Sequence, residues 1–428
     1  MSESQPAPMR RREFLGAAAA ANLLLVTPQT ARGSAANSAV RLGLLGCGGR
    51  GTGVTASFVE TTGVRVTALG DLFPDALQAA KKQFDDLARK RGHAGVDSSH
   101  LFSGPQACEK LVNSKEVDAV YIATPVWWHP EHFEAAVAAG KHVYLEKPVA
   151  VDVPGVNRVL RAAEKGKGRI NMTVGLQLRH ASPYVELFKR VHGGAIGDIV
   201  CGLVHYYAGA LPRPPWPGAS ARVLRVRDWV YDKALSGDIV VEQNVHVIDI
   251  TNWALRNHPL RVTGACGRKG RTDHGNCSSH YDCVFTYPGD IHISFASTQF
   301  IKGSWDVAMR YFGTKGNSEA HYDSPVRIEG DNPWEFPGLG KPGQIADSKV
   351  AATGVFRCSL DDADANKQKH FIESITSGKL LYDIADGADS TLSAIMARQA
   401  AATGEAVTWE QMLRSEEVLE SGIDLNKL

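Results

Sequence analysis

The sequence has no excess of charge of either sign. It carries 47 Lys and Arg residues against 46 Asp and Glu residues, a formal net charge of +1. This balance gives no electrostatic reason to expect a nucleic acid or an anionic membrane surface as a partner. With 43% hydrophobic and 22% charged residues over 428 positions, the composition is that of a soluble globular protein large enough for two domains.

Cysteine pairs with metal-ligand spacing are also missing. No two of the seven cysteines form a CxxC pair, so we expect no structural zinc site and no other metal. Cys277 and Cys283 could pair in an oxidising compartment, but isolated buried thiols are the interpretation we favour. The cysteines lie at Cys47, Cys108, Cys201, Cys266, Cys277, Cys283 and Cys358.

The apolar run near the N-terminus is too short to cross a membrane as a helix. It covers Gly16 to Val26, about eleven residues, whereas a span needs about 20. Three arginines (10–12) precede it and small residues (34–36) follow it, which is the pattern of a signal peptide over residues 1–36, cleaved near Ala36. The stretch "RREFLG" resembles the twin-arginine (Tat) type.

This leader predicts an export route. We expect the Tat export machinery as a partner and the bacterial periplasm as the location, either free or held at the membrane, with no membrane span in the mature form. The alternative is an amphipathic N-terminal helix or a retained anchor.

Short apolar segments alternate with helix-forming segments between residues 38 and 150. Such alternation is typical of an α/β fold with a doubly wound parallel sheet. The expected strands cover 40–45, 64–71, 117–125 and 142–148, and the expected helices cover 52–60, 74–92 and 130–141.

The pattern changes after about residue 150. Helices are expected at 153–166 and 183–193. Longer alternating segments with Gly or Pro-Gly breaks then predict a large, mostly antiparallel open sheet. We expect loops at 211–220 and 330–355. The remaining expected helices cover 366–377 and 385–402. These C-terminal helices could pack back on the first domain.

A glycine-rich loop follows the first expected strand. The sequence GCGGRG fits G-x-G-x-x-G between a strand and a helix, where glycines allow a tight turn and let the backbone and the helix N-terminus approach a pyrophosphate. Asp71 ends the next strand and is placed to accept hydrogen bonds from adenosine ribose hydroxyls, which favours NAD over NADP. Arg50 could pair with a 2′-phosphate, so NADP remains a possible cofactor. The alternative interpretation of the loop is a glycine-rich turn that binds no ligand. The loop residues are Gly46, Cys47, Gly48, Gly49, Arg50 and Gly51.

A lysine lies at the carboxyl end of the last strand expected in this domain. In Glu146-Lys147-Pro148, the ammonium group beside a nicotinamide ring could hold a substrate hydroxyl and lower its pKa as hydride leaves the carbon. The alternative is a solvated lysine after a strand.

These motifs occur together in a known arrangement. The glycine loop, then "ATPVWWHPEHFEAAVAAGKHVYLEKP", then a distant acid-x-x-x-His-x-x-Asp resembles the Gfo/Idh/MocA oxidoreductases over roughly residues 38–320. The resemblance implies a Rossmann domain over 38–150 and a C-terminal α/β domain over 151–428 for substrate and oligomer contacts. It also implies a catalytic role for Lys147, NAD as cofactor, a small carbohydrate substrate, and a homo-oligomer (dimer or tetramer).

The acid-x-x-x-His-x-x-Asp motif consists of Glu242, His246 and Asp249. At i, i+4 and i+7 the three side chains are expected on one helical face. An imidazole there can take the hydroxyl proton, with a carboxylate fixing its tautomer. Where the family has Asp, this chain has Glu242, whose extra methylene moves the carboxylate. The alternative is a solvated surface or a capped core histidine.

Further candidates follow strand ends. The resemblance implies cofactor contacts for Thr124, Pro125, Trp128 and His129, with Glu146, Lys147 and Gln177. Substrate contacts are expected for Arg179, Tyr207, Trp229 and Asp249. Arg179 ends the stretch "TVGLQLR" and is expected to face the cleft, and aromatic faces suit sugar C–H faces. For the aromatic residues, which also include Tyr206 and Trp216, a core or interface position is an equal alternative.

Three functions are compatible with these residues. The first is an exported NAD-dependent oxidoreductase acting on a secondary hydroxyl of a sugar, cyclitol or glycoside. Because Tat export moves folded proteins, its NAD would be inserted in the cytoplasm, held tightly and recycled in place. The second is an NAD-dependent glycosidase that works by transient oxidation, elimination and re-reduction. The third is a non-catalytic sugar-binding protein.

Overall fold

The computed structural model of the chain describes residues 39–212, 214–303, 305–339 and 359–428. The elements discussed below lie within one unit, Arg41–Leu428. The predicted leader at 1–36, Cys358, and the part of the expected 330–355 loop after residue 339 lie outside the described residues.

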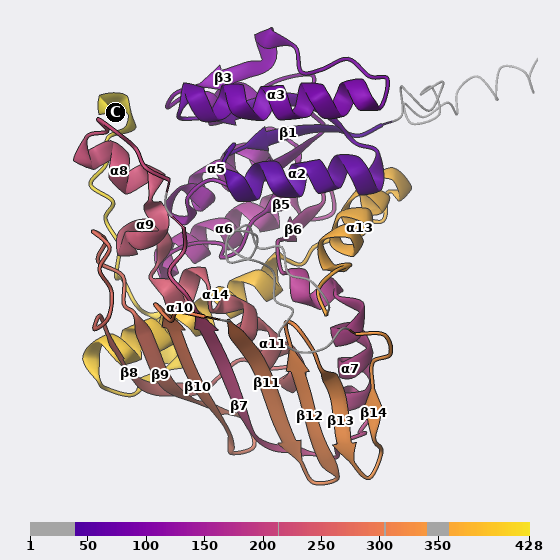
Figure 1. Ribbon diagram of the computed structural model, residues 1–428, viewed down its shortest axis with the longest axis vertical. Helices are drawn as coiled ribbons and strands as arrows, with labels where there is room; N and C mark the ends of the chain where they lie inside the picture. Colours follow the sequence, from indigo (N-terminus) through magenta and orange to yellow (C-terminus); the bar gives the residue numbers. More distant parts are fainter. Residues whose placement is uncertain (1–38, 213, 304, 340–358) are drawn as a thin grey trace, which may run out of the picture. The chain divides into compact units, whose positions relative to one another are not determined.

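The first sheet has six parallel strands in the order β3-β2-β1-β4-β5-β6 (Figure 1). The strand order reverses between β1 and β4, and ligands of such sheets bind beyond the carboxyl ends of the strands at this point. Both strands are buried almost throughout, which explains their continuous apolar sequences. The strands are β1 (Arg41–Leu45), β2 (Arg65–Asp71), β3 (Leu101–Ser103), β4 (Ala119–Ile122), β5 (His142–Leu145) and β6 (Met172–Val174).

The predicted doubly wound parallel sheet is therefore confirmed. Two of its strands, β3 and β6, were not expected from the sequence. β6 comes after residue 150, where the first domain was expected to end, yet it pairs with β5 in the same sheet. Each of the two strands has only three residues, too few to show a period.

Helices follow the strands of this sheet. In α3, Leu77, Ala80 and Phe84 are buried on one face, a proline starts the first turn, and basic residues occupy the last turn, as the macrodipole favours. The helices are α2 (Gly49–Thr62), α3 (Pro74–Lys90), α4 (Ala107–Val112), α5 (His129–Ala138) and α6 (Val153–Gly166).

The second sheet has nine strands in the order β14-β13-β12-β11-β7-β10-β9-β8-β15. All neighbours are antiparallel except β7 and β10, so the predicted mostly antiparallel sheet is confirmed. The strands are β7 (Ile199–Ala208), β8 (Arg261–Gly267), β9 (His280–Tyr287), β10 (Ile291–Gln299), β11 (Asp306–Gly313), β12 (Gly316–His321), β13 (Val326–Gly330), β14 (Trp334–Glu335) and β15 (Val407–Thr408).

Two helices from the C-terminal part contact the parallel-sheet domain. α14 (Ile384–Thr403) packs against α6 and β6 as well as against β8, β9 and α11 (Val245–Leu255), and most of its residues are buried. α13 (Ala363–Ser377) packs on α2 and lies beside it in Figure 1. α14 therefore joins the two sheets through one shared core.

The two faces of the nine-stranded sheet differ. One packs on α11 and α14, while the other exposes Leu203, Val284 and Phe312. The six described cysteines are free, with Cys277 and Cys283 both buried. Within the described residues, no helix combines the length and apolar character that a membrane span requires.

Candidate active site

The glycine loop lies at the carboxyl edge of the parallel sheet. Gly46 has φ +97°, and a Cβ there would lie 2.5 Å from the carbonyl oxygen of Ala123. A Cβ at Gly51 would lie 2.0 Å from the carbonyl oxygen of Gly46. Glycine is required at both positions because the turn is tight and α2 starts against the strand.

The other two glycines of the loop leave space for a ligand. A Cβ at Gly48 or Gly49 would meet nothing within 4 Å, and both residues line two adjoining cavities. Gly48 caps α2 without a side-chain hydrogen bond, and the first turn of α2 holds no acidic residue. Open backbone at the positive end of a helix fits the pyrophosphate of a dinucleotide.

Asp71 lines the second cavity, of about 370 Å³. Its Oδ2 accepts a hydrogen bond from the Cys47 backbone N–H at 2.7 Å, and its Oδ1 accepts one from the Phe73 N–H at 2.8 Å. Burial raises the pKa of Asp71 above its ordinary value. This carboxylate therefore fixes the loop and also faces the cavity where an adenosine ribose would lie.

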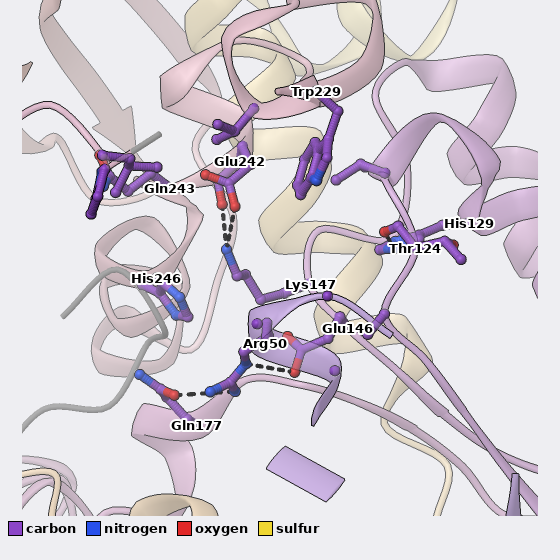
Figure 2. Close-up of a pocket in the computed structure, with 18 of the residues that line it drawn as sticks. Arg50, Thr124, His129, Glu146, Lys147, Gln177, Trp229, Glu242, Gln243 and His246 are labelled. Atoms are coloured by element: carbon purple, nitrogen blue, oxygen red, sulfur yellow. Dashed lines mark hydrogen bonds and ion pairs between the residues drawn. The ribbon is translucent and has the colours of Figure 1, made fainter. Parts of the chain in front are cut away.

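Arg50 belongs to the first cavity, of about 330 Å³. Its guanidinium pairs with Glu146 Oε1 at 2.9 Å and donates to Gln177 at 3.4 Å (Figure 2). It also pairs with Asp364 Oδ2 at 3.1 Å. Asp71 lines only the second cavity, so these ion pairs hold Arg50 in a different part of the site from the expected ribose.

Lys147 and Glu242 meet across the two domains. Lys147 Nζ donates to the Glu242 backbone oxygen at 2.5 Å and to Glu242 Oε1 at 3.1 Å. The two side chains are 13% and 15% exposed. Figure 2 shows this pair above Arg50 and Glu146, with His246 to one side. The ammonium group is thus anchored by the second domain and still reaches the cavity.

His246 lines the same cavity and is 8% exposed. Burial lowers the pKa of His246 well below its ordinary value, and the positive charges of Lys147 and Arg50 lower it further. The imidazole is consequently neutral near pH 7 and able to accept a proton.

The single helix expected to carry Glu242, His246 and Asp249 is interrupted, which corrects the sequence prediction. Glu242 ends α10 (Ile239–Glu242), and α11 begins at Val245 after a two-residue turn. Glu242 and His246 line the first cavity, whereas Asp249 does not, so the structure brings only two of the three groups to one cavity.

Asp249 pairs with Arg179 away from the residues that line the two cavities. Arg179 Nη2 lies 2.8 Å from Asp249 Oδ1, which also accepts a hydrogen bond from the Ser390 hydroxyl at 2.7 Å. Asp249 is 1% exposed. The pair fastens α11 to α14 and to the loop after β6, and neither residue lines a described cavity.

The other expected contacts divide between the two cavities. Tyr206 lines the first cavity, whereas Tyr207 does not, because neighbouring strand residues point to opposite faces. Tyr207 stacks on His205 instead. Thr124, His129, Glu146, Gln177 and Trp229 line the first cavity, and Thr124, Pro125, Trp128, Trp216 and Trp229 line the second.

Several residues of the site were missed from the sequence. Gln243 and Trp305 line the first cavity, and Arg227 lines the second. Asp364 on α13 pairs with Arg50 and with Lys367 of the same helix. Gln243 follows Glu242 directly and could have been found from that motif, but the others reach the site from distant elements and carry no local signal.

No metal centre is seen in the part of the chain that the structure describes. No group of three or more His, Cys, Asp or Glu side chains there has an arrangement able to hold an ion.

Curated relatives include dehydrogenases and glycosidases. The inositol 2-dehydrogenase of Rhizobium meliloti is 25% identical over 368 residues, 85% of this chain and 96% of the relative. A glycosyl hydrolase family 109 protein of Saccharopolyspora erythraea is 28% identical over 226 residues, 48% of this chain and 47% of the relative. The matches to the first five curated relatives, all glycosyl hydrolase family 109 proteins, span from a quarter to about half of those proteins' length.

Solved structures share the fold over most of the chain. The aldose-aldose oxidoreductase of Caulobacter crescentus has a TM-score of 0.66 at 19% identity, covering 86% of this chain and 99% of the other. The scyllo-inositol dehydrogenase of Lactobacillus casei, solved with NAD(H) and scyllo-inositol, has a TM-score of 0.65 at 18% identity, covering 87% and 99%.

Two family models match the chain in succession. "Oxidoreductase family, NAD-binding Rossmann fold" matches residues 40–175, and "GFO/IDH/MocA C-terminal domain" matches residues 184–319. The first range contains the six-stranded sheet and the second contains most of the nine-stranded one. The chain therefore belongs to the Gfo/Idh/MocA family of NAD-binding oxidoreductases.

Proposed function

We propose that this protein oxidises a secondary hydroxyl of a sugar, a cyclitol or a glycoside, with NAD as the hydride acceptor. The observation that carries the proposal is one cavity lined by Lys147, Glu242 and His246 together with Gly48 and Gly49 of the dinucleotide loop. The name of the Rhizobium meliloti relative, an inositol 2-dehydrogenase, supports a cyclitol among the substrates.

When bound, the nicotinamide supplies the acceptor for the hydride that leaves the carbon. His246 takes the hydroxyl proton, since its neutral ring is the basic form. The O–H and C–H bonds break, a C=O bond forms, the proton stays on the imidazole, and the electron pair leaves with the hydride.

Lys147 holds the substrate oxygen in this scheme. An ammonium group has three N–H donors, and among the described residues Glu242 accepts two of its hydrogen bonds. The remaining donor is directed to the substrate oxygen, where positive charge favours the developing alkoxide. Glu242 acts as the anchor that sets the position of Nζ.

The aromatic lining supports a carbohydrate substrate. Tyr206, Trp229 and Trp305 line the cavity beside Glu242 and Gln243. Flat apolar faces next to a carboxylate and an amide suit a molecule with C–H faces and hydroxyl edges.

A screen of sugars, cyclitols and glycosides against the purified protein tests this proposal, with absorbance of the nicotinamide as the readout. Lys147→Met should lower kcat by about 100-fold or more and leave NAD affinity near that of the unchanged protein. Lys189→Met, on an exposed lysine of α7 (Ser182–His192), is the matched control. Full activity in Lys147→Met, or no reduction with any compound, would contradict the proposal.

The glycosidase remains the second candidate, because the first five curated relatives are named glycosyl hydrolase family 109 proteins. It predicts release of the aglycone from a glycoside with no net NADH. Net NADH with an intact glycoside favours the dehydrogenase. Sugar binding with neither NADH nor a released aglycone would support the third function, a non-catalytic sugar-binding protein.

The proposal also covers where NAD is inserted and how it is re-oxidised. Residues 1–36 would direct the folded protein through the Tat machinery to the periplasm with NAD already in place, so NAD must be bound tightly and re-oxidised by a second substrate or a later step. Asp71 favours NAD over NADP. Two or four copies would associate through the exposed sheet face that carries Leu203, Val284 and Phe312.

A further inference from the structure

The cavity beside Asp71 is walled on one side by residues that come from outside the Rossmann domain. Its Rossmann wall includes Asp71, Phe73 and Pro105. The opposite wall comes from a segment between β7 and α10 and from the C-terminal tail. These residues are Pro214, Trp216, Val226, Arg227, Trp229 and Leu425.

Arg227 is the charged contact across this cavity. It ends α8 (Ala221–Arg227), and its guanidinium carbon lies 3.9 Å from the ring centre of Phe73 and 4.2 Å from that of Trp216. It also donates to Asp75 Oδ1 at 2.6 Å. Phe73 and Asp75 follow β2 directly, so the Arg227 side chain of the second domain binds the Rossmann domain just after Asp71.

The C-terminal tail fastens the same segment. The Trp127 indole N–H donates to the Leu419 carbonyl at 2.7 Å, and Arg225 donates to the Ser421 carbonyl at 3.0 Å. A separate apolar cluster, distinct from the main core, joins the segment and tail to the Rossmann domain. Its members include Trp128, Val226, Leu235, Phe73, Trp229, Ile423, Leu425 and Leu428.

We propose that the segment Trp216–Trp229 and the tail residues Leu419–Leu428 form an adenosine cap that retains the cofactor, with Arg227 as its clasp. The inference rests on the proposed NAD binding, because the ribose at Asp71 places the adenosine between the two walls. A nucleotide enclosed in this way leaves only after Arg227 separates from Phe73 and Asp75.

The chemistry of the clasp suits an anionic ligand. The Arg227 side chain is 14% exposed, and its charge lies at the cavity that would hold the adenosine end of a pyrophosphate-containing molecule. Partly desolvated cations over aromatic rings are stabilised more strongly than exposed ones. Closure of the cap and binding of the nucleotide therefore support each other.

The release rate of NADH tests the cap. The purified protein is loaded with NADH and mixed rapidly with excess NAD, and the loss of bound NADH fluorescence gives the dissociation rate constant. Arg227→Gln should release NADH about tenfold faster, because it loses the ring contact with Phe73 and the ion pair with Asp75 that join the cap to the Rossmann domain. Trp216→Ala should act in the same direction.

Arg158→Gln is the matched control, since Arg158 also pairs with a carboxylate, Glu134, on the Rossmann surface and lines neither cavity. It should release NADH at the unchanged rate. Hydrogen exchange of the unchanged protein gives a second readout, in which the amides of α8 become protected when NADH is added.

The outcomes separate the two proposals. If the unchanged protein binds no dinucleotide, the proposed function fails, and the cap fails with it. If NADH binds but Arg227→Gln releases it at the original rate, the proposed function stands and the cap is wrong. If that variant does not fold, hydrogen exchange of the unchanged protein decides. The cap is wrong if the amides of α8 exchange at the same rate with and without NADH, and it is supported if NADH protects them.

Discussion

Asp71 serves the loop and the cavity at once. Each of its oxygens accepts one backbone hydrogen bond, from Cys47 or from Phe73. The same carboxylate lines the cavity that Arg227 also lines. The sequence suggested Arg50 as the residue that could pair with the 2′-phosphate of NADP, but Arg50 is paired with Glu146 and Asp364. Arg227 is the arginine that lines the cavity of Asp71 and could contact such a phosphate.

At this residue a single substitution should change the choice of cofactor. Asp71→Asn removes the charge that repels a 2′-phosphate but keeps an acceptor for the loop, so we expect NAD affinity to fall about tenfold and NADP affinity to rise. Titration of each dinucleotide by fluorescence measures both. Asp282→Asn, on the exposed face of β9, serves as the control. An unchanged NAD to NADP ratio would contradict the role of Asp71.

At the scale of elements, α13 supplies an ion-pair partner to Arg50, which lines the first cavity. Asp364 pairs with Arg50 at 3.1 Å and with Lys367 at 3.0 Å, and Arg50 in turn pairs with Glu146. Burial raises the pKa of Asp364, but Arg50 and Lys367 outweigh burial and hold it well below the ordinary value. A helix some 300 residues away in sequence thus sets the position of the glycine-loop arginine.

Loss of this carboxylate should destabilise the fold. Asp364→Asn removes the carboxylate that pairs with the buried Lys367 and one of the carboxylates that pair with Arg50, and we expect it to lower the free energy of unfolding by about 3 kcal/mol at pH 7. Because the folded pKa of Asp364 is depressed, its contribution is complete above the unfolded pKa, about 3.9, and is lost as pH falls below it.

Urea unfolding at pH 7 and at pH 3 checks both parts of this expectation. The gap between the unchanged protein and Asp364→Asn should narrow at the lower pH. Asp86→Asn, which breaks exposed pairs with Lys82 and Arg89, should change stability little at either pH. Equal stability of Asp364→Asn and the unchanged protein at pH 7 would count against the α13 cluster.

Local sequence patterns predicted the elements with a clear period or a fixed turn. The loop at Gly46 and Gly51, and α3 with its buried face, follow from side-chain size and spacing. The interruption after Glu242 was missed because the apolar residues around it continue a helical pattern. The Arg50–Asp364 and Arg227–Asp75 pairs join residues far apart in sequence, and no local pattern encodes such pairing.

At the scale of the whole molecule, the two sheets share a core through α14. The first cavity draws Glu146 and Lys147 from one domain and Glu242 and His246 from the other. A ligand in this cavity contacts both domains, so it should stabilise them together.

NAD should therefore raise the temperature of one cooperative unfolding transition. At 100 times the dissociation constant, binding to the folded state adds about 2.7 kcal/mol to the free energy of unfolding. Scanning calorimetry with and without NAD measures the shift, and cytidine monophosphate provides the control. Two transitions, of which NAD moves only one, would show that the domains unfold separately.

The wall of the second cavity has a consequence for how the protein is made. It combines Gly46, near the start of the described chain, with Leu425, close to its last residue. A ribosome must synthesise the chain from Gly46 through Leu425 before both sides of this cavity exist. If NAD binds as proposed, a nascent chain that has not yet reached Leu425 cannot enclose its adenosine end, so we expect the dinucleotide to be captured only after both walls of this cavity have been synthesised.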